Sequence, residues 1–204
     1  MHRRALKVFR KSDPTLAKFI AKWGPCGIVA NQELTPFASL ARSICYQQLH
    51  GRAAATIWGR ALDVCGGARR FTPKNVLDAD DDEMRSAGLS RNKLLAIKDL
   101  ARMAGEQRRF TWRTLESMSD DEIIELLTEV RGVGVWTVQM LLIFSLARPD
   151  VLPIHDYGVR KGYAVLYKRK DHPTPKDLSE LGERWRPFRS VASWYLWRAA
   201  DGAS

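Results

Sequence analysis

Apolar residues recur at intervals of three and four along most of this 204-residue chain, interrupted by capping residues and glycines. In residues 90–105, Ser90 stands at a capping position, apolar side chains share one helical face, and Gly105 follows them. The same pattern predicts helices over residues 12–24, 35–67 (two helices meeting near 50–51), 73–79, 80–87 and 119–130. Ser119 and Glu122 match a capping box. No strand-like alternation of useful length appears, so the sequence predicts an all-α fold.

Two glycines lie between two predicted helices in "EIIELLTEVRGVGVWTVQMLLIFSLA", residues 122–147. Gly132 and Gly134 permit a positive φ and let a polyanion approach the backbone without a Cβ in the way. The N–H groups of this turn, with the start of the second helix, could bind a phosphate. From two glycines alone, a plain helix–helix connector is the simpler interpretation.

The charge of the chain favours a polyanionic partner. Lys and Arg number 33 against 23 Asp and Glu, which gives a formal net charge of +10. The segments 78–83 and 119–129 are acidic, whereas residues 148–198 are rich in Lys and Arg. We therefore expect one positive face and one solvated negative face.

Several classes of protein and site are disfavoured. The three cysteines are too few for a disulfide framework, and the four histidines lack companions at metal-ligand spacing, so we expect no side-chain metal site and a reducing, cytoplasmic location. The apolar run 135–147 is shorter than the roughly 20 residues of a membrane span. The N-terminus lacks the apolar core of a signal peptide, so we expect no membrane partner.

Five sequence blocks carry a family resemblance. "L-T-E-V-R-G-V-G-V-W-T-V" resembles the helix-hairpin-helix of DNA glycosylases, typically L-P-G-I-G-x-W-T-A, and "LPIHDYGVRKG" resembles the segment that carries their catalytic aspartate. "ICYQQLHGRAAATIWGR", "AGLSRNKLLAIKDLA" and "ERWRPFRSVASWYLW" are similar to further family blocks, in the expected order. The chain is identified as a member of the helix-hairpin-helix (HhH-GPD) superfamily, of the 3-methyladenine DNA glycosylase II type. Arg131 replaces the usual hairpin proline, and His155 replaces a common acid.

The resemblance implies two helical subdomains that flank an active-site cleft. Residues 36–130 would form an inserted helical subdomain, and residues 1–35 with 131–204 would carry the hairpin and the catalytic aspartate. It also implies a compact form without the additional N-terminal domain of some relatives. We expect a monomeric, bacterial-type enzyme that acts on damaged double-stranded DNA.

Asp156 is the expected catalytic residue. Breaking an N-glycosidic bond builds positive charge on the sugar, which a nearby carboxylate stabilises while it orients or deprotonates water. An Asp before a helix is more often simply an N-cap, and both roles are compatible because a cap fixes the carboxylate.

Trp136 indicates a monofunctional hydrolase. In the related glycosylase-lyases this position is a lysine that forms a Schiff base. Relatives with an iron–sulfur cluster have four cysteines near the C-terminus, whereas this chain has none after Cys65, so we expect no cofactor.

The resemblance places Trp136 and Trp197 in the base pocket, together with Met140, which would reshape it. An alkylated purine is cationic, so electron-rich aromatic rings favour it. For Trp197, core packing is an equally good interpretation. Trp58, Trp185 and Trp194 are assigned to packing.

The resemblance also assigns the contacts with DNA. Gln48 would fill the space left by the flipped base, Gln47 would contact the substrate, and the alternative is a pair of solvated glutamines. Gly132, Val133 and Gly134 would bind the DNA backbone. Further candidates, each of which could be an ordinary surface residue, are His50, Arg52, His155, Arg160, Lys161 and Arg189, the last of which could instead pair internally.

Main-chain carbonyls of Thr128, Val130 and Val133 map to a cation site in the family hairpin. Together these features predict a glycosylase of base excision repair that removes alkylated purines of the 3-methyladenine and 7-methylguanine type and leaves an abasic site. The alternatives are another base specificity (uracil, mismatched adenine or oxidised guanine) and a non-catalytic DNA-binding module.

Overall fold

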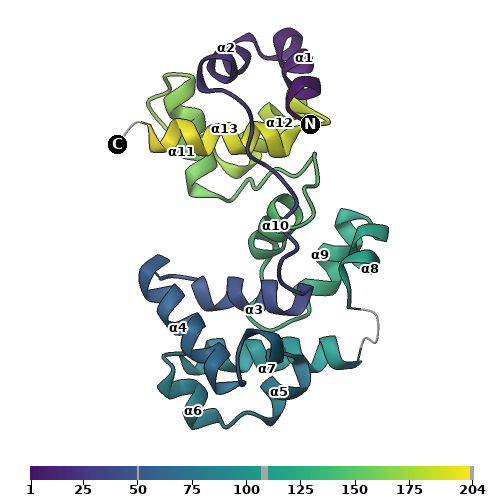
Figure 1. The fold of residues 1–204 in the computed structure, drawn as a ribbon. Coiled ribbons are helices and arrows are strands. Elements are labelled where there is room, and N and C mark those ends of the chain that lie inside the picture. The colour runs from purple at the N-terminus through teal and green to yellow at the C-terminus, as the bar shows by residue number, and fades with distance from the viewer. Residues whose placement is uncertain (50, 107–109, 203–204) are drawn as a thin grey trace. The chain divides into compact units, whose positions relative to one another are not determined.

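The computed structural model describes residues 1–49, 51–106 and 110–202, and these residues form helices without any strand. The elements are α1 (His2–Ser12), α2 (Pro14–Trp23), α3 (Pro36–Tyr46), α4 (Gly51–Val64), η1 (Ala68–Arg70), α5 (Pro73–Asp78), α6 (Asp81–Ser86), α7 (Arg91–Glu106), α8 (Trp112–Ser117), α9 (Asp120–Thr128), α10 (Val135–Phe144), α11 (Tyr157–Leu166), α12 (Pro175–Gly182), η2 (Glu183–Trp185) and α13 (Arg189–Asp201) (Figure 1). The prediction of an all-α fold is confirmed.

The chain divides into two compact units. The terminal unit contains Met1–Ala30 and Leu142–Ser204, and the central unit contains Asn31–Leu141. The hairpin and the first part of α10 thus belong to the central unit, whereas the sequence-based division grouped them with the catalytic aspartate. The difference arises because one boundary falls inside α10, a single helix that continues from one unit into the other.

In the central unit, α7 packs against α3, α5 and α6, and α4 packs against α3 and α6. Phe71 is central to the core: its ring stacks on Phe37 at 5.5 Å and meets the edge of Trp58 at 4.9 Å. Trp58 is buried, as expected for a packing residue.

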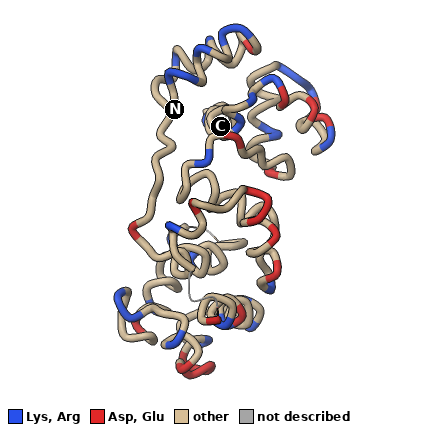
Figure 2. The backbone as a smooth tube through the Cα atoms, turned by 90° about the vertical axis from the view of Figure 1, so that its right-hand side faces the viewer, with Lys and Arg blue, Asp and Glu red and all other residues tan. Residues whose placement is uncertain are grey.

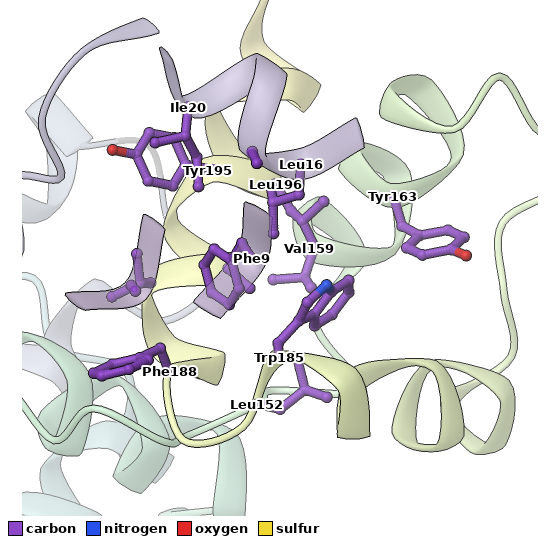
Figure 3. Packing of buried hydrophobic residues seen from close by; sticks show 14 of the residues in the cluster. Phe9, Leu16, Ile20, Leu152, Val159, Tyr163, Trp185, Phe188, Tyr195 and Leu196 are labelled. Atoms are coloured by element: carbon purple, nitrogen blue, oxygen red, sulfur yellow. The ribbon is translucent and has the colours of Figure 1, made fainter. Parts of the chain in front are cut away.

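In the terminal unit, α11 and α13 pack against each other, and α13 also contacts α2 and η2. Figure 3 shows the core that these helices enclose, with the side chains of Phe9, Trp185, Tyr195 and Leu196 directed inward. Trp185 is fully buried, in agreement with its assignment to packing. Trp194 is half-buried, and its ring meets Tyr195 edge-on at 4.8 Å.

A buried carboxylate joins three elements of this unit. Asp13 caps α2 by accepting the N–H of Leu16 at 3.1 Å, and its other oxygen accepts the indole N–H of Trp185 at 2.8 Å. The same oxygen accepts the hydroxyl of Tyr167 and pairs with the guanidinium of Arg184 at 3.1 Å. Burial, followed by the bond to Asp13, raises the pKa of the Tyr167 phenol, so it remains a hydrogen-bond donor.

Helix α1 is an element that the sequence analysis did not predict. Ala5 and Phe9 are buried, while the Lys and Arg residues of this helix are exposed and it contains no acid (Figure 2). Its N-cap, Met1, makes no side-chain capping bond, so the usual start signal is missing. The helix is therefore stabilised by packing of its apolar face.

The predicted helix boundaries are accurate where caps define them. The capping box of Ser119 and Glu122 is present, and Asp13 caps α2. The helix α7 instead continues past Gly105 to Glu106, and α10 ends at Phe144, three residues before the end of the apolar run at 147.

Replacing Asp13 by Ala should strongly destabilise the terminal unit. The substitution leaves the buried partners of the carboxylate unpaired, which costs about 3–5 kcal/mol for a broken buried ion pair. Urea unfolding followed by fluorescence measures the loss. The matched control is Thr174→Ala, which removes the exposed N-cap of α12 in the same unit and should cost only about 1 kcal/mol. Equal losses for the two variants would contradict a central role for Asp13.

Candidate active site and DNA-binding hairpin

The hairpin between α9 and α10 is a tight turn in the central unit. Val133 N–H donates to the carbonyl of Val130 at 3.1 Å, and Gly132 has φ +74°, where a side chain would be strained. Gly134 has nothing within 4 Å of the position of a Cβ, and its carbonyl accepts the N–H of Thr137 at 2.9 Å as α10 begins. The glycines therefore form an exposed turn directly before a helix N-terminus, a geometry suited to phosphate. The Val133 side chain is buried, so only its main chain is available to a ligand.

A cavity of about 420 Å³ lies within the central unit, and that volume is typical of small-molecule sites. It is lined by Ser43, Tyr46, Gln47, Gln48, Trp136, Thr137 and Met140. Four of the predicted substrate and wedge residues thus line one cavity. Trp136 remains 45% exposed, so part of this side chain is accessible to a ligand.

Gln47 joins the turn after α3 to the hairpin. Its side-chain amide donates to the carbonyl of Gly132 at 3.2 Å and to the hydroxyl of Thr137 at 3.4 Å. The interpretation of Gln47 as a solvated helix-end residue is therefore wrong, because its side-chain amide is hydrogen-bonded to Gly132, which lies 85 residues further along the chain. A contact with substrate would use the remaining hydrogen-bonding capacity of the amide.

Gln48 is exposed and has φ +56°, a conformation that is uncommon for a residue with a Cβ. Such strain persists only where the surrounding structure enforces it, and it is often found at functional sites. This residue therefore projects from a constrained turn.

Asp156 is the N-cap of α11 in the terminal unit. Its Oδ1 accepts the N–H of Val159 at 2.8 Å and the indole N–H of Trp197 at 2.8 Å. Two donors on one oxygen restrict the rotation of the carboxylate. Asp156 is an N-cap, and its half-buried side chain is also fixed in orientation. The geometry is therefore compatible with both expected roles, helix cap and catalytic acid.

Trp197 lies between this carboxylate and a second aromatic ring. Its indole stacks on Phe144 with a centroid separation of 5.6 Å and an angle of 30°. Phe144 is itself 41% exposed, whereas Trp197 is half-buried and packs against the core of the terminal unit, as the packing alternative expected. Trp197 is therefore a hydrogen-bonding partner of Asp156, a role that the sequence analysis did not assign to it.

Two glycines of α11 permit this arrangement, and neither was singled out from the sequence. A Cβ on Gly162 would lie 1.8 Å from the carbonyl oxygen of Leu196, so the backbones of α11 and α13 touch there. A Cβ on Gly158 would lie 2.8 Å from Trp197 and 3.1 Å from Asp156. The spacing G-x-x-x-G places both glycines on one helix face, and this pattern could have revealed a close helix contact.

The predicted phosphate contacts differ in their surroundings. Arg160 donates from Nε to the carbonyl of Pro173 at 2.7 Å, which anchors its guanidinium, and His155 is exposed in the turn before α11. Arg189 pairs with Asp150 at 2.8 Å, so the alternative of internal pairing is correct. Arg52 is exposed, Lys161 is half-buried, and His50 lies outside the described residues.

The predicted cation site at the hairpin would use main-chain carbonyls as donors. Thr128 ends α9 and Val130 follows it, so their carbonyls lie at the negative end of a helix. The Val130 carbonyl also accepts the N–H of Val133, which leaves one lone pair for a hard cation. With the Val133 carbonyl these groups would hold a cation that assists phosphate binding, and this site remains a prediction.

The structure gathers the predicted residues into two sets. Gln47, Gln48, Trp136 and Met140 share the cavity of the central unit, whose hairpin carries the two glycines. Asp156 and Trp197 share a hydrogen bond in the terminal unit.

Substitution of Gly158 by Ala should displace Trp197 from Asp156 without unfolding the chain. The added methyl group would collide with the indole, which has to rotate and thereby lose its bond to the carboxylate. The indole N–H resonance of Trp197 should shift in a ¹H–¹⁵N spectrum. The matched control is Gly59→Ala, because a Cβ at this helical glycine meets nothing within 4 Å. An unchanged Trp197 resonance in the Gly158 variant would contradict the described packing.

Comparison with known proteins identifies the family. The model of the HhH-GPD superfamily base excision DNA repair proteins matches residues 41–187. A DNA-3-methyladenine glycosylase of Schizosaccharomyces pombe is 36% identical over 91% of this chain and 80% of its own length.

Two solved structures have the same fold. A 3-methyladenine DNA glycosylase of S. pombe, in complex with abasic DNA, superposes with a TM-score of 0.82 and 33% identity, covering 96% of this chain and 95% of the other. A DNA-3-methyladenine glycosidase from Bacillus halodurans gives a TM-score of 0.85 and 35% identity, covering 96% and 88%. The predicted family is thus confirmed, and the chain belongs to the HhH-GPD superfamily of base excision DNA repair proteins.

Proposed function

We propose that this protein is a monofunctional DNA glycosylase that hydrolyses the N-glycosidic bond of alkylated purines in duplex DNA and leaves an abasic site. The relatives named above are 3-methyladenine glycosylases, and one of them was solved with abasic DNA. The observation that carries the proposal is the fixed carboxylate of Asp156, which accepts hydrogen bonds from Val159 and Trp197.

The carboxylate would act on the sugar. As the bond between C1′ and the base nitrogen breaks, the base leaves with the electron pair and the sugar becomes positively charged. Asp156 would stabilise that charge and accept a proton from the water that attacks C1′. Its orientation is set before substrate arrives, because both bonds to Oδ1 are internal to the fold.

The cavity of the central unit would receive the flipped base. An alkylated purine carries a positive charge that is attracted to the indole of Trp136, while the Met140 thioether supplies a soft, polarisable wall. Because the charge already makes the purine a good leaving group, no strong general acid is required. This aromatic lining favours alkylated purines over neutral bases such as uracil.

The exposed elements of the central unit would bind the DNA backbone and occupy the space of the flipped base. Gly132 and Gly134 would present main-chain N–H groups to a phosphate, with His155 and Arg160 of the terminal unit as further contacts. Gln48 would be the wedge, because its constrained turn projects an exposed amide side chain. We also propose that a cation binds to the main-chain carbonyls of Thr128, Val130 and Val133 and assists the binding of phosphate.

We further propose that the protein acts as a monomer in a reducing compartment such as the cytoplasm. The residues that line the cavity and the hydrogen-bonded pair of Asp156 and Trp197 each come from a single copy of the chain. The three cysteines are free thiols, which suits a reducing location. No helix in the described part of the chain is both long and apolar enough to cross a membrane.

Asp156→Asn should lower the single-turnover release of 7-methylguanine from duplex DNA by about a hundredfold or more. Asparagine is an equally good N-cap and can accept both existing bonds, so the substitution removes the charge and retains the fold. Binding to DNA that contains an abasic-site analogue should remain near the wild-type level.

The matched control for this experiment is Asp177→Asn. Asp177 also lies at the start of a helix in the terminal unit, but it is exposed and serves only the capping box of α12. Release by this variant should equal that of the wild type. Undiminished release by the Asp156 variant would exclude the mechanism, and tight, salt-sensitive binding without any release by the wild type would favour a DNA-binding module.

Borohydride reduction during the reaction should trap no covalent complex with DNA. The lyase reaction needs an amine that forms a Schiff base with C1′, and Trp136 has none. The product should be an abasic site with an unbroken strand, visible on a denaturing gel only after alkali. A trapped complex would show that another lysine provides lyase activity and that the protein is bifunctional.

A further inference from the structure

Helix α7 contacts two separate parts of the DNA-binding surface proposed for the central unit. Lys93, Ala96 and Asp99 follow each other at intervals of three residues and therefore share one side of this helix. One end of this row meets the turn that carries Gln48, and the other end meets the glycine hairpin.

Lys93 holds the end of α3. Its ammonium group donates to the carbonyl of Cys45 at 2.8 Å and to the carbonyl of Gln47 at 2.7 Å. The last carbonyls of a helix lack intrahelical partners, so a cation at this place satisfies them and complements the helix dipole. The second of these carbonyls belongs to Gln47, and the next residue, Gln48, has a positive φ.

Asp99 and Ala96 hold the hairpin. The carboxylate of Asp99 accepts the main-chain N–H of Arg131 at 2.8 Å. A Cβ on Gly132 would lie 3.5 Å from the Cβ of Ala96, which is ordinary van der Waals contact. The hairpin backbone therefore rests against the side of α7.

The two supported segments are also joined to each other. Gln47 donates from its side chain to the carbonyl of Gly132 at 3.2 Å. The backbone of one residue, Gln47, is thus bound to Lys93, while its side chain is bound to the hairpin that Asp99 supports. Lys93 and Asp99 lie six positions apart in the helix, a rigid spacing of about 9 Å along its axis.

We propose that Lys93 and Asp99 are positioning residues that hold the wedge turn and the phosphate-binding hairpin at a fixed separation, so that the wedge enters the DNA stack at the nucleotide whose backbone the hairpin binds. This inference rests on the proposed function. Neither residue needs to touch the substrate, because both act through main-chain groups of the segments that do.

The experiment compares two lysines of the same helix. Lys98 also donates to a main-chain carbonyl, that of Ala79 at 3.1 Å, and pairs with Asp81, but it supports α5 and α6 and has no bond to the turn or the hairpin. Lys93→Met and Lys98→Met therefore remove similar bonds and the same charge. Their melting temperatures show whether the two losses of stability are comparable.

The first readout is insertion of the wedge. A duplex with 2-aminopurine beside a tetrahydrofuran abasic analogue should become brighter at saturating wild-type protein, because unstacking raises the fluorescence. Lys93→Met should lose most of this increase, whereas Lys98→Met should retain it. Equal responses of the two variants would overturn the proposal.

The second readout separates positioning from general damage to the fold. Lys93→Met should slow single-turnover release of 7-methylguanine paired with cytosine by about tenfold, and release from a mismatch by much less, because a mismatched base costs less to extrude. Lys93→Arg should restore most of the rate. Equal slowing on both substrates would contradict a role in flipping.

Asp99 provides an independent pair of variants. Asp99→Ala removes the acceptor for the Arg131 N–H and should reduce both signals, whereas Asp99→Asn keeps a carbonyl acceptor and should restore them. If the wild type raised the fluorescence but released no base, the proposed glycosylase function would be contradicted. The proposal that Lys93 and Asp99 position the wedge turn and the hairpin would then still stand. Absence of both wild-type signals would overturn both proposals.

Discussion

The backbone contact between α11 and α13 at Gly162 is the constraint on which the catalytic end of the terminal unit depends. The Cβ of any other residue would lie 1.8 Å from the carbonyl oxygen of Leu196, so no other residue permits this approach. The next residue along α13 is Trp197, and one turn before Gly162 lies Gly158, against which the indole packs. The hydrogen bond between Trp197 and Asp156 is therefore a consequence of helix packing, and the carboxylate is oriented by the core and not by a flexible loop.

The central unit achieves rigidity by a different means. Its functional segments are a turn and a hairpin, which have no helical bonds of their own, and polar side chains satisfy their main-chain groups. Gln47, Lys93 and Asp99 each bond to main-chain groups of these segments, and partial burial lowers the pKa of Lys93 because desolvation disfavours its charge. A loop that is fixed in this way can approach DNA closely and still keep its shape.

Sequence reasoning predicted the features that depend on neighbouring residues. The Asp156 cap, the capping box of α9 and the glycine turn are all specified within a few residues, so these helix boundaries followed from local patterns, whereas the choice of Asp156 as the catalytic acid came from the family resemblance. The contacts of Gln47 with Gly132 and of Lys93 with Gln47 cross 85 and 46 residues, and no local pattern encodes them. Helix α1 was missed because it lacks a side-chain cap, and the division of the chain differed because α10 continues through a boundary.

The two glycines of α11 help to distinguish an enzyme from a protein that only binds DNA. Each glycine within a helix lowers its stability by about 1 kcal/mol relative to alanine, and α11 contains Gly158 and Gly162. A binding module needs the hairpin and the wedge turn, both in the central unit, and for it Asp156 would serve only as the N-cap of α11, a role that does not require the second bond from Trp197. The two glycines instead bring an indole N–H within 2.8 Å of Asp156. Gly162 serves the packing of the two helices, whereas Gly158 leaves room for the indole that binds Asp156, and an acid held in a fixed orientation is expected of a catalytic site, where preorganised charge stabilises the transition state.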